Sequence, residues 1–456
     1  MVLLLVCATS ATPLVHADSG ANATLGGNVS ASDNAFASAS GEKQADIYWQ
    51  IRPGALFGYE TPRAVYTALV EAEATDYIDH NDQAAFSVRA NGHATFVTSP
   101  TSALDLAATV STGKLNALAG RSTPDQTGTQ LVAIGSGNIY SVGGTQGYSS
   151  QLAQNVRFSQ SAAVNYVETD TGSATSRATQ GSVGIGMTKS TDGNAFTVEV
   201  GATLVRFLTY DPGDAMRPAT GRLDHELDPR ASMGWRHDLS RAWSTSLTAG
   251  LQALVPYGED RYNPTRTELK TSVSPMASAQ LSYVDTWGYA NVVVTHGLAP
   301  NLTLAQNTTT DSAALNAAIP LAMFESHGRP PRLTASGSIG YFRSTLEDTR
   351  TNADLGTFSG EHVDVGVAYL PRPNQIYGLR YSLAHQTGSA TAGAMTASLT
   401  TNTISFTFSL RYPDRIQVRE RKASVRADES DTKAVDDKRS DADIDSDTGG
   451  TTKRSD

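Results

Sequence analysis

The fold class is decided by the segment TISFTFSLRY, residues Thr403 to Tyr412. Every second residue from Ile404 to Tyr412 is apolar or aromatic, and the residues between them are polar. Because successive side chains of a β-strand point to opposite faces, this period of two predicts a strand with one apolar and one polar face.

The same alternation recurs along the chain, in the segments Phe86–Phe96, Phe196–Leu204, Trp243–Tyr257, Val363–Tyr369 and Tyr377–Leu383. Several of these segments are longer than the strands of soluble sheets and match a tilted membrane-spanning strand. Aromatic residues collect at the ends of the apolar stripes, as interfacial girdles require: Phe57, Tyr59, Trp243, Tyr257, Tyr369 and Tyr412. No apolar run is long enough for a transmembrane helix.

The connections between the predicted strands alternate between short and long. The short ones are Asp192–Asn194, Ser240–Arg241, Asp285–Thr286 and Arg372–Asn374. The long ones are Asp211–Pro229, Gly258–Ser272, Thr303–Ala314, Glu347–Glu361 and Thr387–Thr400. Short periplasmic turns opposite long outer loops are typical of an all-β, transmembrane, antiparallel up-and-down β-barrel, here of roughly 16 strands with 14–18 possible.

The ends of the chain predict segments outside the barrel. Residues 1–17 form an apolar stretch that ends in an A-x-A-like site and predict a cleavable signal peptide, although no Lys or Arg precedes it. Residues 18–45, rich in Ser, Ala, Asn and Gly, predict a flexible leader. Residues 46–412 predict the barrel, and residues 413–456 a disordered, charged periplasmic tail.

One stretch inside the barrel segment departs from the alternation of connections. Residues Ala119 to Tyr148 are rich in Gly, Thr and Ser where a short turn is expected. They predict either a further hairpin around Leu131–Ile139 or a periplasmic or lumenal insert.

Composition and motifs exclude several functional classes. The net charge is −10 with both signs mixed along the chain, so no basic surface for nucleic acid is predicted. The only cysteine, Cys7, lies in the predicted signal peptide, which suits export to an oxidising compartment. No G-x-S-x-G or H-E-x-x-H motif is present, and His237 and Asp238 are strand neighbours that point apart. We therefore expect no enzyme activity, no metal and no cofactor.

On these residues the chain resembles the outer-membrane β-barrel proteins of Gram-negative bacteria, the class that includes porins. Its closing strand looks like the assembly signal of that class, carried by Phe406, Phe408, Leu410 and Tyr412. In many members the aromatic residue ends the chain, whereas here a charged tail follows Tyr412. The resemblance implies residence in the outer membrane, contact with its lipid, and recognition by periplasmic chaperones and the barrel-assembly machinery.

The polar faces of the predicted strands supply candidates for lining a pore. They are Arg52, Glu71, Glu73, Arg89, His93, Asp105, Glu199, Arg236, Asp238, Asp364, Arg380 and Arg411. In one interpretation, opposed acidic and basic residues set up a transverse field that orients polar solutes. In the other, they form ion pairs that only stabilise the wall. Glu71 and Glu73, two apart on one face, are also weak candidates for holding a cation.

Four functions follow from this pattern. The first is a channel for passive diffusion of small polar solutes. The second is a plugged barrel that displays loops at the surface, and the third is a hydrolase with a site at the rim. The fourth is a secreted soluble β-protein, which would need a second sheet over the apolar strand faces.

Overall fold

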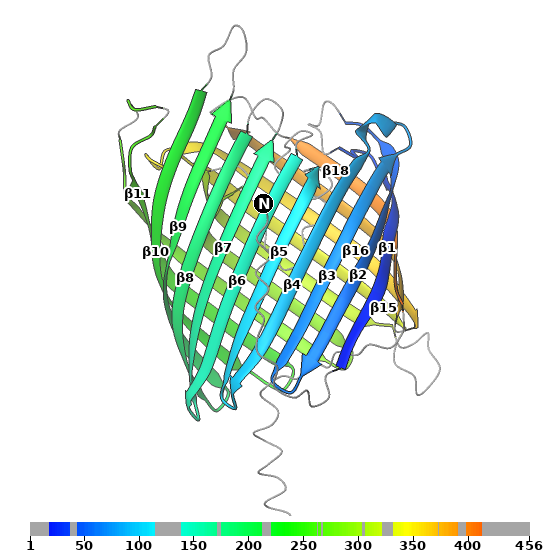
Figure 1. Ribbon diagram of the computed structural model, residues 1–456, viewed down its shortest axis with the longest axis horizontal. Helices are drawn as coiled ribbons and strands as arrows, with labels where there is room; N and C mark the ends of the chain where they lie inside the picture. The colour runs from blue at the N-terminus through cyan, green and yellow to red at the C-terminus, as the bar shows by residue number, and fades with distance from the viewer. Residues whose placement is uncertain are drawn as a thin grey trace, which may run out of the picture.

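The computed structural model describes residues 18–36, 43–114, 138–170, 175–211, 220–261, 263–265, 268–302, 306–321, 332–372, 374–390 and 398–412. Eighteen antiparallel strands form one sheet, and pairing of β1 with β18 closes it into a barrel (Figure 1). The strands are β1 (Asp18–Ser32), β2 (Asp46–Thr61), β3 (Ala64–Tyr77), β4 (Ala85–Ser99), β5 (Ser102–Lys114), β6 (Asn138–Ala153), β7 (Val156–Asp170), β8 (Thr175–Thr191), β9 (Asn194–Asp211), β10 (Thr220–Asp238), β11 (Trp243–Tyr257), β12 (Ser272–Asp285), β13 (Gly288–Asn301), β14 (Gln306–Pro320), β15 (Leu333–Glu347), β16 (Asp354–Arg372), β17 (Gln375–Ala390) and β18 (Leu399–Tyr412).

The all-β barrel predicted from the sequence is confirmed, with 18 strands rather than about 16. Within the described ranges the helical structure is the single turn η1 (Asn81–Gln83). None of the helical structure described is long and apolar enough to cross a bilayer. No second sheet covers the barrel in the described part of the chain, so the two-sheet arrangement needed by a soluble β-protein is not found there.

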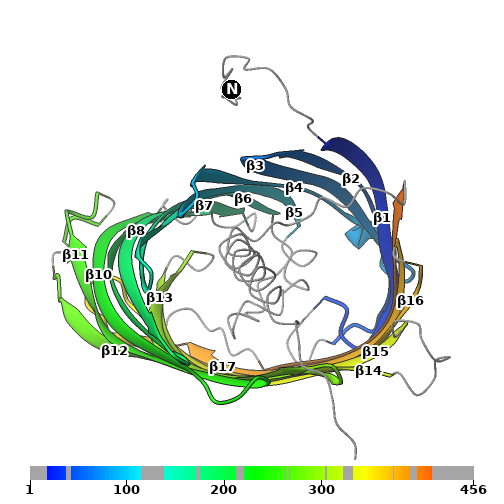
Figure 2. The same cartoon turned by 90° about the horizontal axis from the view of Figure 1, so that it is seen from below.

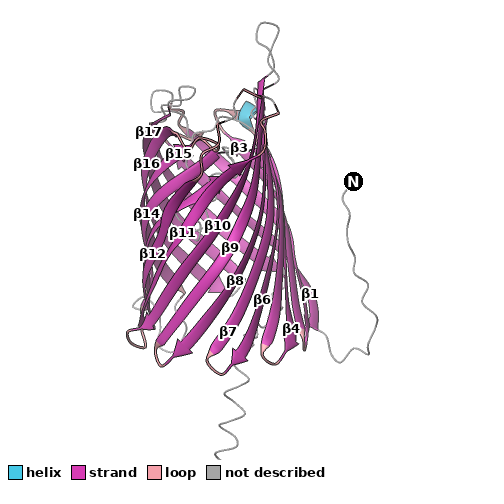
Figure 3. Ribbon diagram, turned by 90° about the vertical axis from the view of Figure 1, so that its left-hand side faces the viewer, coloured by secondary structure: helices cyan, strands magenta, loops and turns pink. Residues whose placement is uncertain are grey.

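The two ends of the barrel differ in their connections (Figure 3). At the short-turn end, all connections but 321–332 span four residues or fewer, and Gly193 takes a φ of 69° in one of the tight turns. At the opposite, long-loop end lie η1 and the strand ends at Ser32, Asp46, Lys114, Asn138, Tyr257 and Ser272. Because the strand number is even, Asp18 and Tyr412 both lie at the short-turn end.

The predicted flexible leader is wrong over most of its length, because β1 lies within it and pairs with both β18 and β2. Its polar side chains alternate with apolar ones: Asn28 and Ser30 are buried, while Leu25 and Val29 are exposed. The apolar positions are mostly alanine, so the contrast between the faces is weak in the sequence. The barrel therefore begins at Asp18 rather than at residue 46.

Several predicted long connections are shorter than expected. Strands β10, β14, β16 and β18 begin at Thr220, Gln306, Asp354 and Leu399, inside the segments taken as loops. These strand ends are rich in Thr, Ser or charged residues on both faces, which hides the period of two. Residues Asn138 to Tyr148 likewise belong to β6, and the connection before them lies at the long-loop end. The predictions of a signal peptide, of an insert and of a charged tail concern residues 1–17, 115–137 and 413–456, which lie outside the described residues.

Because the sheet is closed, one of its faces is the exterior of the barrel and the other is the interior. On β1, β2 and β18 the exposed apolar residues share one face, where Val29 pairs with both Trp49 and Phe406. On the other face of β1 even small polar side chains are buried, with Ser30 only 1% exposed against 51% for Val29. Side chains crowd on the concave side of a closed sheet, so the polar face is the interior and the apolar face is the exterior.

Aromatic side chains mark the short-turn end of the apolar exterior. Tyr59 contacts Tyr66, which contacts Phe96, and on the far wall Trp243 contacts Tyr283. Such a girdle is expected where a barrel leaves the hydrocarbon for the lipid headgroups. In the closing strand the predicted signal residues Phe406, Phe408, Leu410 and Tyr412 follow the exterior alternation. Their recognition during assembly stays a prediction.

Candidate functional site

The twelve residues predicted to line a pore all lie on the interior alternation of their strands. This placement follows from the register, because none of them pairs with an exposed apolar residue of a neighbouring strand; Glu71, for example, pairs with Arg89 and Gly54. The strands bring eleven of the twelve, all but Arg411, into contacts with an acidic or basic partner, described below. Whether they line a conducting path stays a prediction.

The first set of contacts is a ladder of charges on β2, β3 and β4, formed by Arg52, Glu71, Glu73 and Arg89. Arg89 Nη2 lies 2.5 Å from Glu71 Oε2, and Arg52 Nε lies 3.8 Å from Glu73 Oε2. The Glu73 side chain is only 3% exposed, whereas those of Arg52 and Arg89 reach 27% and 34%. We call these four residues the β2–β4 ladder. Each carboxylate faces an arginine, so arginine takes the place of the cation considered for Glu71 and Glu73.

The second set of contacts is more open to solvent. Arg380 Nη2 lies 2.8 Å from Asp364 Oδ1, and Arg236 Nε lies 3.4 Å from Asp238 Oδ1. His93 approaches Asp105 at 3.9 Å, with both side chains about half exposed. Here the charges remain solvated, so they are available to a solute in the lumen as well as to each other.

The pair of Glu199 with Arg230 adds a basic residue that the sequence reading missed. Glu199 Oε1 lies 3.3 Å from Arg230 Nη2, across the β9–β10 pairing. Arg411 lies on the interior face of β18, next to its end at Tyr412. The interior thus carries both charge signs, as the sequence predicted.

A structural feature that the sequence did not predict lies at the long-loop end, where the sheet splits. Pairing of β12 with β13 stops at Ala277 and His296, although β13 continues to Asn301 and stays paired with β14. Figure 2 shows the β13 ribbon on the lumen side of β10 to β12. We call the described residues 297–302 and 306–308 the tucked tip.

Apolar contacts hold the tucked tip against the inside of the wall. Leu302 packs against Ala178, Val205 and Phe207, which are buried on the interior face of β8 and β9. Phe207 is 1% exposed although it faces the lumen, because the tip covers it. Two layers of the same sheet therefore overlap at this end, and the tip narrows the lumen there.

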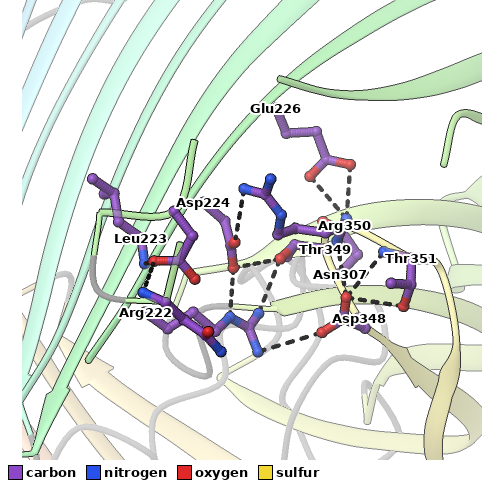
Figure 4. Close-up of polar contacts among 11 residues, drawn as sticks. Arg222, Leu223, Asp224, Glu226, Asn307, Asp348, Thr349, Arg350 and Thr351 are labelled. Atoms are coloured by element: carbon purple, nitrogen blue, oxygen red, sulfur yellow. Dashed lines mark hydrogen bonds and ion pairs between the residues drawn. The ribbon is translucent and has the colours of Figure 1, made fainter. Parts of the chain in front are cut away.

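Polar contacts join the same two layers (Figure 4). Asn307 Nδ2 donates to both carboxylate oxygens of Glu226 at 2.8 Å. The loop between β15 and β16 adds Thr349, whose Oγ1 donates to Asp224 Oδ2 at 2.6 Å. Arg350, 2% exposed, donates from Nη2 to the Gly258 carbonyl at 3.1 Å and lies 3.9 Å from Asp224. This set ties β10 to both the tip and the neighbouring loops.

The acidic side of these contacts comes from one strand. Asp224, Glu226 and Asp228 occupy alternate positions on the interior face of β10, and each is at most 1% exposed. We call them the β10 acidic stripe. The available signal is the alternation R-L-D-H-E-L-D-P-R from Arg222 to Arg230, most of which falls in the segment Asp211–Pro229 that the sequence analysis predicts as a long connection. Pro229 is tolerated because it faces outward and lies in a short gap of the β10–β11 pairing, between Leu227 and Arg230.

No catalytic arrangement emerges from the described residues. His237 Nδ1 contacts the Gly193 carbonyl and Asn194 Oδ1, while Asp238 faces Arg236, so these neighbours do not support each other. His296 Nδ1 lies 2.6 Å from Asp311 Oδ1 on the exterior face. The strand neighbours of this pair are Ala277 and Arg343, which supply no hydroxyl nucleophile. No group of three His, Cys, Asp or Glu among the described residues is placed to share a metal ion.

A closed antiparallel barrel with an apolar exterior, an aromatic girdle and a polar, charged interior satisfies what a bilayer demands of a spanning sheet. The protein has the fold of a membrane-spanning, antiparallel β-barrel. Each described strand pairs with a neighbour on both sides around the ring, and the pairing of β12 with β13 stops above Ala277 and His296.

Comparisons with known proteins add the following. No family model and no curated protein matches the sequence. Similar solved structures include the FrpB iron transporter of Neisseria meningitidis, 8% identical, with a TM-score of 0.47 over 83% of this chain and 64% of that one. Acinetobacter baumannii OccAB3 is 9% identical and has a TM-score of 0.46, and the match covers 87% of the present chain and 100% of OccAB3. The outer membrane protein OpdK of Pseudomonas aeruginosa is 9% identical, with a TM-score of 0.43 over 86% and 99%.

Proposed function

We propose that the protein is a channel for passive diffusion of small polar solutes across the outer membrane. The observation that carries the proposal is the set of solvated, oppositely charged pairs on the interior face. Arg236, Asp238 and Arg380 each leave more than half of the side chain exposed to the lumen. Solvated acidic and basic groups side by side on a wide barrel wall offer both charge signs to a dipolar solute and keep the path wet.

The test is single-channel conductance of the detergent-purified protein in a planar bilayer. We expect stable conductance steps, and a change of ion selectivity when Arg380 is replaced by Gln, because Asp364 then loses its counter-charge. Asp192→Asn, in an exposed short turn, is the control and leaves selectivity unchanged. A barrel that is folded, as judged by heat-modifiable migration on a gel, yet gives no conductance contradicts the proposal.

A second function is favoured by the tucked tip. Because the tip and the β15–β16 loop lie inside the wall at the long-loop end, a barrel held closed there would present its loops without conducting. A folded, silent barrel that begins to conduct once the tip is loosened, by Leu302→Ala, supports this closed state over the open channel.

A further inference from the structure

The buried carboxylate of Glu226 meets the Asn307 amide between β10 and the tucked tip, and the buried carboxylate of Asp228 lies two residues further along the same face of β10. Glu226 and Asp228 are both 0% exposed, and Asn307, from β14, is also 0% exposed. The Asn307 amide nitrogen donates to both oxygens of Glu226. The three side chains come from two layers that are far apart along the sheet, with β11, β12 and β13 between them.

Three oxygen atoms of this group have no partner within the described structure. Both carboxylate oxygens of Asp228 are buried and accept no hydrogen bond, and the same is true of Asn307 Oδ1. Buried carboxylates in proteins are normally paired, hydrogen-bonded or bound to a metal, because a charged group that is taken out of water without a partner destabilises the folded state. The two bare oxygens of the Asp228 carboxylate therefore indicate a missing positive ligand on β10.

The surrounding negative charges further favour a positive ligand at this position. Glu226 lies within electrostatic range of three further carboxylates, those of Asp228, Asp224 and Glu347. The arginines nearest along the strand and in the seam have other partners: Arg222 contacts Asp224 and Asp348, and Arg350 contacts Asp224 and the Gly258 carbonyl. Arg230, two residues beyond Asp228 on the same face, contacts Glu199. Neither Glu226 nor Asp228 takes part in an ion pair in the part of the chain that the structure describes.

We propose that this interlayer position binds one divalent cation, Ca²⁺, through the carboxylates of Glu226 and Asp228 and the amide oxygen of Asn307. Two carboxylates balance the charge of the ion, and carboxylate and amide oxygens are the ligands that Ca²⁺ takes. The Asn307 side chain turns its amide over, so that Oδ1 faces the ion in place of Nδ2; the two orientations occupy the same space. Water completes the coordination shell.

The chemistry favours Ca²⁺ over Mg²⁺. Mg²⁺ requires a near-ideal octahedron and keeps several waters, which suits a solvated cleft better than a buried seam between two sheet layers. Ca²⁺ accepts irregular coordination. The bound ion would link β10 to β14 and so fasten the tucked tip to the wall, independently of whether the barrel conducts.

The test is calorimetric titration of Ca²⁺ into the refolded full-length barrel, stripped of metal with EDTA and dialysed. We expect one Ca²⁺ per chain, at least tenfold weaker binding in Asp228→Asn and Glu226→Gln, and at least tenfold weaker binding of Mg²⁺ to the unaltered protein. Asp238→Asn is the matched control, because it makes the same change on the same strand and face at a solvated position. Its Ca²⁺ affinity stays within twofold of the unaltered protein.

A thermal melt provides the second readout, with folding of each variant checked by heat-modifiable migration. Ca²⁺ raises the Tm of the unaltered protein and of Asp238→Asn, and leaves that of Asp228→Asn unchanged. Asn307→Ala removes the oxygen ligand that β14 supplies and leaves the carboxylates of β10 unchanged, and it also weakens Ca²⁺ binding. This variant is used in place of the acidic variants if those do not fold. The proposal is overturned if no saturable binding occurs, if binding survives both acidic substitutions, or if Asp228→Asn melts higher than the unaltered protein whether or not Ca²⁺ is present. The last outcome means that the carboxyl carries a proton instead.

Discussion

The β2–β4 ladder and the β10 acidic stripe are built from the same pattern and behave differently. In both, charged residues occupy alternate positions on the interior face of long strands. In the ladder the two signs lie on neighbouring strands, so the register that pairs Glu71 with Arg89 also supplies its counter-charge. In the stripe three acids lie on one strand, and their cover comes from a layer four strands away.

The comparison shows that two separate features set the strength of charge pairs on the interior face. Strand register decides which charged side chains are neighbours, and a covering layer of chain decides how far they are exposed to water. The Glu71–Arg89 pair of the ladder, with side chains 19% and 34% exposed, contributes about 0–1 kcal/mol to the free energy of unfolding, whereas Glu73, 3% exposed, is not a solvated charge. Charges that a second layer seals from water need a partner, and removing that partner costs about 3–5 kcal/mol. The same sequence pattern thus stands for a weakly coupled lumen lining in one place and a tightly coupled seam in the other.

The largest expected effect tests which face is inside, on which the whole comparison depends. Replacing Phe406 and Phe408 together with Asp puts charge on the lipid side of β18. A charge there costs up to about 2–4 kcal/mol per basic residue at mid-depth and less for acids. Two such residues on the strand that closes the barrel should abolish assembly, measured as loss of the heat-modifiable, membrane-inserted form.

The matched control is Ser405→Asp with Thr407→Asp, on the opposite face of the same strand. These residues point into the barrel, so assembly is retained. If both double variants assemble equally well, the two faces have been assigned wrongly, and neither the ladder nor the stripe lies in the lumen.

The next largest effect is the loss of stability on removing a buried arginine, compared with the loss on removing an exposed one. Arg350→Ala removes a buried guanidinium that bonds the Gly258 carbonyl and lies beside Asp224. We expect the free energy of unfolding to fall by about 3 kcal/mol, as for other buried charge partners. Urea unfolding of the barrel in lipid vesicles measures it.

The control is Arg236→Ala, at an arginine on β10 with 64% of its side chain exposed. Its loss should cost less than about 1 kcal/mol. Equal losses at Arg350 and Arg236 would mean that the cover over the stripe does not exclude water.

The third effect concerns the apolar part of the seam. Leu302→Ala removes packing against Val205 and Phe207. We expect a loss of about 2 kcal/mol, the low end of the range for such truncations, because Leu302 is only partly buried. Hydrogen exchange should quicken at residues 298–301 and 306–307 and stay unchanged in β2 to β4. Faster exchange throughout the barrel would show that the tip is not a separate layer.

Local features of the barrel were accessible from the sequence. The period of two places Arg52, Glu71 and Arg89 on the interior because parity along a strand is a local property. It failed where the two faces differ little in hydrophobicity. In β1 the exterior residues are largely alanine, and in β10 the interior charges and Pro229 suggested a loop. Because β1 and part of β10 were not recognised as strands, the predicted number of strands is too low.

The seam was inaccessible for another reason. That Asn307 meets Glu226 depends on where pairing of β12 with β13 stops, and on the path of a tip that crosses three strands. Neither is encoded in the periodicity of either segment. The sequence revealed three alternating acids, but their burial is a property of the layer that covers them.

The smallest expected effect is at the ladder, where Glu71→Gln leaves Arg89 without its carboxylate. The free energy of unfolding should fall by less than about 1 kcal/mol, because Arg89 keeps contact with lumen water and 34% of its side chain is exposed. The freed positive charge should instead shift the reversal potential of the channel toward anions, measured in a salt gradient across a planar bilayer. Asp192→Asn, the same change of charge in a short turn, leaves the reversal potential where it was. A loss of several kcal/mol from Glu71→Gln would mean that the ladder is sealed like the stripe, and that burial rather than register sets the strength of both.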